Sequence, residues 1–136
     1  MTVLNNKIFG RIGEDAAFAY LKEKGYRIVG MNYNTRHGEL DIIALKRRVL
    51  VFAEVKTRSS LAYGYPAERI DYAKIGRMRK AATEFCRVDG AGHRVPLYIW
   101  KFRYTRKYKK RRFDTVEIIA DEQGVKRLTH TENVFR

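Results

Sequence analysis

Two apolar segments, residues 39–45 and 49–57, are separated by only three residues, and this feature constrains the fold most strongly. Both segments are rich in Ile, Val, Leu and Phe, and so short a separation favours a β-hairpin. If the chain turns about Arg47 and Arg48, Asp41 lies directly opposite Glu54. A four-residue loop keeps the same pairing, whereas an odd-length loop would shift it. The hairpin therefore predicts two facing carboxylates.

Facing carboxylates repel each other and weaken a hairpin, so the pair indicates a cation between them. Ligands that are all oxygen suit a hard divalent ion such as Mg²⁺ or Mn²⁺. Glu54 and Lys56 lie on one face of their strand because side chains alternate, and the lysine could face an anion held by the ion. The alternative is a structural Glu–Lys pair beside an ordinary strand-end aspartate, and the residues taken alone favour that alternative.

The charge of the chain points to a polyanionic partner. The 136 residues carry a net charge of +14, and 45% of them are hydrophobic, which fits a single globular domain over residues 1–136. A field of this sign attracts polyanions and speeds their encounter. Nucleic acid is the first candidate partner and an anionic membrane surface the second. The remaining interpretation is a basic surface that is simply solvated.

Several site classes and locations are not expected. Cys86 is the single cysteine, and the histidines at 37, 93 and 130 match no zinc spacing. The N-terminus holds Lys7, Arg11, Glu14 and Asp15, which is unlike a signal peptide. No apolar run approaches the ~20 residues of a membrane span. We therefore expect a cytoplasmic protein with no membrane partner.

Periodicity and capping residues predict two helices and a set of strands. Residues 58–66 are expected to form a loop. Strands that first run together and then alternate with helices favour an α/β fold with a mixed β-sheet flanked by helices. The expected order is α-β-β-β-α-β-β: helix 7–24, strands 26–33, 39–45 and 49–57, helix 71–87, strands 96–104 and 113–120, and a short strand at 125–128.

The segments GELDIIA (38–44) and VFAEVKTR (51–58) resemble the PD-(D/E)XK nuclease core. More narrowly, the chain resembles the YraN-like family of predicted endonucleases, which are related to Holliday junction resolvases. Leu40 replaces the proline of the superfamily name, which is not a metal ligand. Further similarity covers nearly the whole chain, in GRIGEDAA (10–17), GYRI (25–28), NY (32–33), RFD (112–114) and HTENVF (130–135).

The resemblance implies a restriction-endonuclease-like three-layer fold and a divalent-metal-dependent endonuclease. It implies that Asp41, Glu54 and the backbone carbonyl of Val55 bind the metal. Such an ion polarises the scissile phosphate and activates water, while Lys56 would orient that water or neutralise phosphate charge. A glutamate on the first helix, Glu14 here, would complete the site.

Other acidic residues near this pattern have two interpretations each. Glu14 borders the apolar stripe of its helix, so it either binds a partner or is a partly exposed rim residue. Gly13 beside it would let the helix approach the sheet closely. Glu39 shares a strand face with Asp41 and is either a secondary or second-metal contact or a solvated carboxylate. Asp114 is explained as well by a salt bridge as by a catalytic role.

A basic segment at residues 101–112 contains eight cations and no acid, with Phe102, Tyr104 and Tyr108 between them. Cations neutralise phosphates and rings stack on exposed bases, so the segment predicts nucleic-acid binding; the alternative is a flexible solvated connection. Four cations elsewhere could extend this surface, although the Lys74 stem could instead pack. The predicted contacts are Arg58, Lys74, Arg77, Lys80, Lys101, Arg103, Arg106, Lys107, Lys109, Lys110, Arg111 and Arg112.

The leading hypothesis is thus an endonuclease that hydrolyses DNA, with branched DNA as one candidate substrate. Junction resolution needs two coordinated cuts, so that role would imply a two-fold homodimer. The alternative is a non-catalytic nucleic-acid-binding protein on a nuclease-like scaffold. A small basic protein docked on a ribonucleoprotein is the third hypothesis.

Overall fold

The predicted hairpin lies at the centre of the fold. Its strands are β2 (Gly38–Lys46) and β3 (Val49–Ser59), which pair antiparallel with Lys46 facing Val49. Arg47 and Arg48 form the two-residue turn with φ values of 49° and 63°. Both values lie in the left-handed region that a type I′ turn requires, although neither residue is the Gly or Asn favoured there. The predicted register is confirmed from Lys46–Val49 to Ile42–Ala53, and the paired ladder ends before Asp41 and Glu54.

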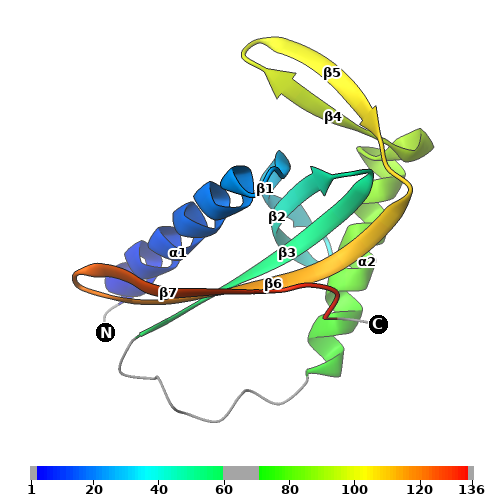
Figure 1. Cartoon of the computed structure of the whole chain (residues 1–136). Helices are drawn as coiled ribbons and strands as arrows, with labels where there is room; N and C mark the ends of the chain where they lie inside the picture. The colour runs from blue at the N-terminus through cyan, green and yellow to red at the C-terminus, as the bar shows by residue number, and fades with distance from the viewer. Residues whose placement is uncertain (1–2, 60–70, 135–136) are drawn as a thin grey trace.

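The computed structural model describes residues 3–59 and 71–134 of the chain (Figure 1). Three strands join the hairpin in one sheet, namely β1 (Arg27–Thr35), β6 (Lys110–Asp121) and β7 (Gly124–Thr131), in the order β1-β2-β3-β6-β7. β3 and β6 are parallel and the other neighbours are antiparallel. The sheet is therefore mixed, as predicted.

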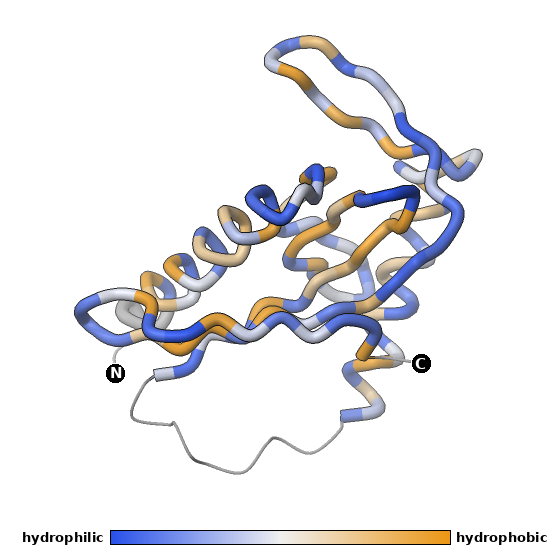
Figure 2. Tube along the Cα trace, viewed as in Figure 1, coloured by the Kyte–Doolittle hydropathy of each residue, from blue (hydrophilic) through white to orange (hydrophobic). Residues whose placement is uncertain are grey.

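Helices cover both faces of this sheet. α1 (Val3–Glu23) packs Ala17 and Leu21 against Ile42 and Ala44, and α2 (Tyr72–Val88) packs Phe85 on the opposite face. Because both faces are covered, the central strands are apolar almost without interruption, as the orange tube segments of the hairpin show (Figure 2). The α/β three-layer architecture expected of a restriction-endonuclease-like fold is confirmed.

α1 approaches the sheet closely at Gly13. A Cβ built on Gly13 would lie 1.8 Å from Thr57 Oγ1 on β3. No side chain larger than hydrogen fits without moving the helix or the strand. This close contact was expected from the glycine beside Glu14, and it brings Glu14 towards the sheet.

The predicted single strand at 96–104 was wrong. The chain forms a short helix η2 (Ala91–His93) and then a separate hairpin of β4 (Arg94–Ile99) and β5 (Phe102–Lys107), which turns at Trp100 and Lys101. Alternating apolar and basic residues are compatible with one long strand or with two shorter strands joined by a turn. Only the presence of the turn distinguishes these two possibilities. The predicted short strand at 125–128 lies within the longer strand β7. Residues 60–66 of the predicted loop lie outside the described residues.

Among residues 3–59 and 71–134, no helix is both long enough and apolar enough to cross a membrane.

Candidate functional site

Asp41 lies at the point where the hydrogen-bonded ladder between β2 and β3 ends. The last paired residues there are Ile42 and Ala53. Beyond them, the backbone N–H of Val55 donates to Asp41 Oδ2 at 2.9 Å. The side chain takes over the role of a ladder carbonyl, and its carboxylate is held in a fixed place next to β3.

Three carboxylates from two elements converge around this point. Oxygen atoms of Glu14 on α1 and of Glu39 and Asp41 on β2 all lie within 4.8 Å of one another. In its hydrogen-bonding orientation, the Asn32 amide nitrogen donates to Glu39 Oε1 at 2.8 Å and to Glu14 Oε1 at 3.3 Å. The acidic group, defined as Glu14, Glu39 and Asp41, offers only oxygen ligands. This donor set fits a hard divalent cation such as Mg²⁺ or Mn²⁺.

The environment of the acidic group shifts the pKa of Asp41. Burial, together with the charges of Glu14, Glu54 and Glu39, raises the pKa of Asp41 to about 6, against the lowering effect of the hydrogen bond from Val55. Converging negative charge of this kind favours binding of a proton and also of a metal ion. The two would compete for the carboxylate at pH values below about 6.

Glu54 has a different partner from the one expected. Its residue is 8% exposed, and its carboxylate forms an ion pair with Lys74 on α2. Asp71 caps that helix by accepting from the Lys74 N–H at 3.0 Å, which places Lys74 in the first turn. Glu54 therefore lies outside the acidic group. Glu39, expected as a secondary or second-metal contact or as a solvated carboxylate, lies inside it. Lys74, expected to contact nucleic acid, neutralises Glu54.

A cleft of about 270 Å³ opens beside these residues. Its lining includes Glu39, Asp41 and Glu54 from the hairpin, and Lys74 and Met78 from α2. Lys56 lies half-buried two residues beyond Glu54 on β3, in register with Glu117 of β6. Three carboxylates and the Lys74 ammonium thus line one concavity large enough for a phosphate group.

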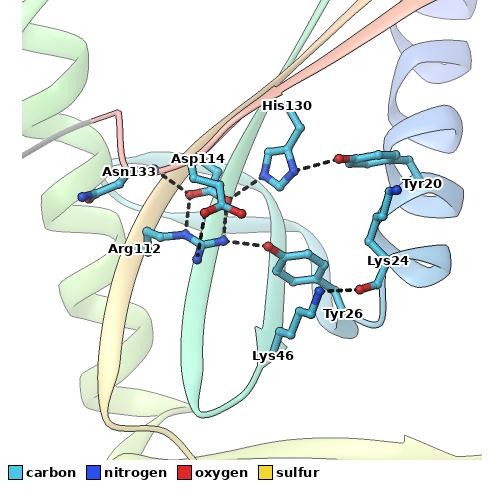
Figure 3. Close-up of polar contacts among 9 residues, drawn as sticks. Tyr20, Lys24, Tyr26, Lys46, Arg112, Asp114, His130 and Asn133 are labelled. Carbon is cyan, nitrogen blue, oxygen red and sulfur yellow. Dashed lines mark hydrogen bonds and ion pairs between the residues drawn. The ribbon is translucent and has the colours of Figure 1, made fainter.

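Asp114 is the centre of a buried polar network (Figure 3). Its carboxylate is fully buried and accepts from Arg112 at 2.8 and 2.9 Å and from the Asn133 N–H at 3.0 Å, and it contacts His130 Nε2 at 2.7 Å. Burial alone would raise the pKa of Asp114, but the hydrogen bonds from His130 and Arg112 lower it. The salt-bridge interpretation of Asp114 therefore fits.

This network changes the interpretation of two residues in the basic segment. Arg112, predicted to contact nucleic acid, binds Asp114 and also donates to Tyr26 Oη at 2.7 Å. Tyr108, predicted to stack on bases, is buried and donates to the Gly90 carbonyl at 3.0 Å. Both side chains make hydrogen bonds within the protein and so do not belong to the predicted nucleic-acid surface. Exposed members of the predicted surface are Arg77, Lys80, Lys101, Arg103, Arg106, Lys107, Lys109, Lys110 and Arg111, and Arg58 is half-buried.

Comparison with known proteins gives the family. The profile of Uncharacterised protein family UPF0102 matches residues 13–118, which include the acidic group, Glu54 and Lys56. The chain belongs to the UPF0102 family. A UPF0102 protein of Alkaliphilus oremlandii is 41% identical over 130 residues, covering 96% of this chain and 99% of its own length. One from Dictyoglomus thermophilum is 40% identical over 121 residues, covering 89% and 90%.

The YraN-like resemblance is confirmed by this UPF0102 membership. The matched region covers the second half of α1, which carries Glu14, all of α2, and the strands that carry the candidate site. Its description names no reaction, so the chemistry of the site has to indicate the function.

Two features of the structure were not expected from the sequence. Asn32 links two acidic side chains from different elements, although the sequence marked it only through the resemblance at residues 32–33. Tyr98, Ile99 and Trp100 form an exposed tip on the β4–β5 hairpin. The adjacent pair Trp100-Lys101 between two apolar-basic runs was the available signal for that turn.

Proposed function

We propose that this UPF0102 protein is a divalent-metal-dependent endonuclease that hydrolyses phosphodiester bonds of DNA. The observation that carries the proposal is the convergence of Glu14, Glu39 and Asp41 within 4.8 Å in a chain whose net charge is +14. Three carboxylates that converge in an otherwise basic protein repel one another, and a bound cation would relieve that repulsion. Phosphodiesters are polyanionic substrates that the remaining surface attracts.

In this proposal the acidic group holds Mg²⁺ or Mn²⁺. When bound, the ion supplies Lewis-acid polarisation of a phosphate and activation of water. Asn32 orients Glu39 and Glu14, and the Val55 N–H orients Asp41. The Lys56 ammonium orients the attacking water or neutralises charge on the phosphate, at a strand position two residues from Glu54. Exposed cations of α2 and of the β4–β5 hairpin bind the DNA backbone.

Branched DNA is the candidate substrate that the resolvase resemblance implies. Two coordinated cuts at a junction would require a two-fold dimer of this chain. We also propose a cytoplasmic location, with which a DNA substrate is compatible.

The ion pair between Glu54 and Lys74 favours a second candidate function. A lysine that neutralises one expected metal ligand is also what a non-catalytic DNA-binding protein on a nuclease-like scaffold would have. Calorimetry with MnCl₂ separates the two functions. DNA binding without any Mn²⁺ uptake would favour the binding protein.

The cleavage test uses branched, single-stranded and duplex DNA, each with Mg²⁺, Mn²⁺ or EDTA. We expect cutting only with metal, and a loss of about 100-fold or more in Asp41→Asn and Lys56→Ala. Glu23→Gln is the matched control, because Glu23 is an exposed carboxylate at the end of α1. Cutting that persists in Asp41→Asn would refute the assignment and point to a contaminating nuclease.

A metal titration tests the ligand set separately. Glu14→Gln and Glu39→Gln should each weaken Mn²⁺ binding about 10-fold or more, since each removes one anionic ligand. Glu23→Gln should bind as the unmodified protein does. Equal weakening by Glu23→Gln would mean that only the overall charge matters.

A further inference from the structure

The hairpin of β4 and β5 ends in an exposed apolar tip. Tyr98, Ile99, Trp100 and Phe102 are 63% to 81% exposed. Figure 1 shows the hairpin projecting from the rest of the molecule, and Figure 2 shows hydrophobic segments on it. Large apolar side chains gathered in this way mark a surface that another molecule covers.

The apolar face of the hairpin extends beyond the core that supports it. At its base, Leu97 pairs with Tyr104, and both pack on the core between the sheet and α2. The next pair on the same face is Ile99 with Phe102, because side chains alternate along a strand. That pair is exposed. The folded chain itself leaves this part of the face uncovered.

Trp100 occupies a strained turn position. Its φ of 56° lies in the left-handed region, where glycine would be the ordinary residue and a large side chain costs free energy. The Lys101 ammonium lies 4.6 Å from the centre of the Trp100 ring, and the Phe102 ring centre lies 6.3 Å from it. Two rings and a cation thus stand together at the tip.

The charge around the hairpin identifies the partner. β4, β5 and their turn contain five cations and no acid. At the base of the hairpin lies a cleft of about 370 Å³ in which seven of ten lining residues are Arg or Lys and none is acidic, among them Arg47, Arg48 and Arg106. A second copy of the same +14 chain would be repelled here. A polyanion that also carries flat apolar rings fits both features.

We propose that the hairpin tip stacks on unpaired bases while the cleft at its base binds the phosphates. The protein would then favour nucleic acid with a single-stranded segment or a branch point, because paired bases are not free to stack on side chains. This proposal rests on the nucleic-acid substrate of the proposed function and names its class. Base–aromatic stacking with a basic groove is a general mode of single-strand binding.

The test uses the fluorescence of Trp100, the single tryptophan of the chain. The intact protein is titrated in EDTA with a single-stranded oligonucleotide, an abasic strand of equal length, and a fully paired duplex. We expect quenching by the base-containing single strand and little quenching by the abasic strand. Variants that lack Trp100 are followed by the anisotropy of a fluorescein-labelled oligonucleotide. Trp100→Ala with Phe102→Ala should weaken single-strand binding about 10- to 100-fold and leave abasic binding unchanged. Trp100→Phe should largely restore the affinity.

Val88→Ala is the control, because Val88 is an exposed apolar residue at the end of α2. Equal quenching by the abasic strand, or unchanged single-strand affinity in the double variant, would overturn the proposal. A stronger Trp100 fluorescence response to phosphatidylglycerol vesicles than to the single-stranded oligonucleotide would overturn it in favour of a membrane partner. Self-association in sedimentation that Trp100→Ala abolishes would overturn it in favour of a dimer. Because EDTA prevents cleavage, these outcomes are independent of whether the acidic group cuts DNA.

Discussion

Lys74 in the first turn of α2 forms an ion pair with Glu54 on β3, across the cleft that also contains Asp41. The lysine therefore neutralises the candidate carboxylate ligand that lies outside the acidic group. A metal ion and this ammonium would compete for the same carboxylate.

Replacing Lys74 should strengthen metal binding. In Lys74→Met the Glu54 carboxylate has no competing ammonium, so Mn²⁺ affinity measured by calorimetry should rise about 10-fold. The Lys74 side chain is 43% exposed, so the loss of folding stability should be only about 1 kcal/mol. Lys80→Met makes the same charge change on the exposed side of α2 and should leave Mn²⁺ affinity unchanged. Equal Mn²⁺ affinities in the unmodified protein, Lys74→Met and Lys80→Met would show that Glu54 takes no part in metal binding.

Removing the Asp41 charge should stabilise the metal-free protein. The pKa of Asp41 is raised to about 6 in the folded state from 3.8, so its ionisation destabilises the fold as pH rises through that window. Asp41→Asn should therefore raise stability by about 1–2 kcal/mol at pH 8. Below about pH 4 the two proteins should have equal stability. Thermal unfolding in EDTA at both pH values measures this, and a less stable variant at pH 8 would contradict it.

The close contact at Gly13 predicts a position-specific loss of stability. Gly13→Ala places a methyl group against Thr57, so α1 must shift, at a cost of about 2–3 kcal/mol in denaturant unfolding. Gly10→Ala on the same helix meets no atom within 4 Å. That control should be stabilised by about 0.5–1 kcal/mol, because alanine favours a helix. Equal effects at both positions would refute the close packing.

Arg112 should act on stability and not on DNA binding. Arg112→Lys loses the two-pronged contact with the buried Asp114 carboxylate, and unfolding free energy should fall by about 2–4 kcal/mol. The slope of log Kd against log salt concentration for DNA should not change. Arg103→Gln removes an exposed cation of the hairpin, and it should reduce that slope by about 1 with little effect on stability. A reduced slope in Arg112→Lys would return Arg112 to the binding surface.

The sequence by itself determined the hairpin and its register. These features are local, because side-chain alternation and a short loop fix which residues face each other. Motif resemblance added Glu14 and the three-layer fold. Only the tertiary structure decided that Glu14 of α1 meets Glu39 and Asp41 of β2. It also decided that Lys74 of α2 neutralises Glu54 of β3, and that Arg112 of β6 donates to Tyr26. These contacts join parts of the chain that are distant in sequence, so they depend on where each helix and strand packs, and no sequence periodicity specifies that packing.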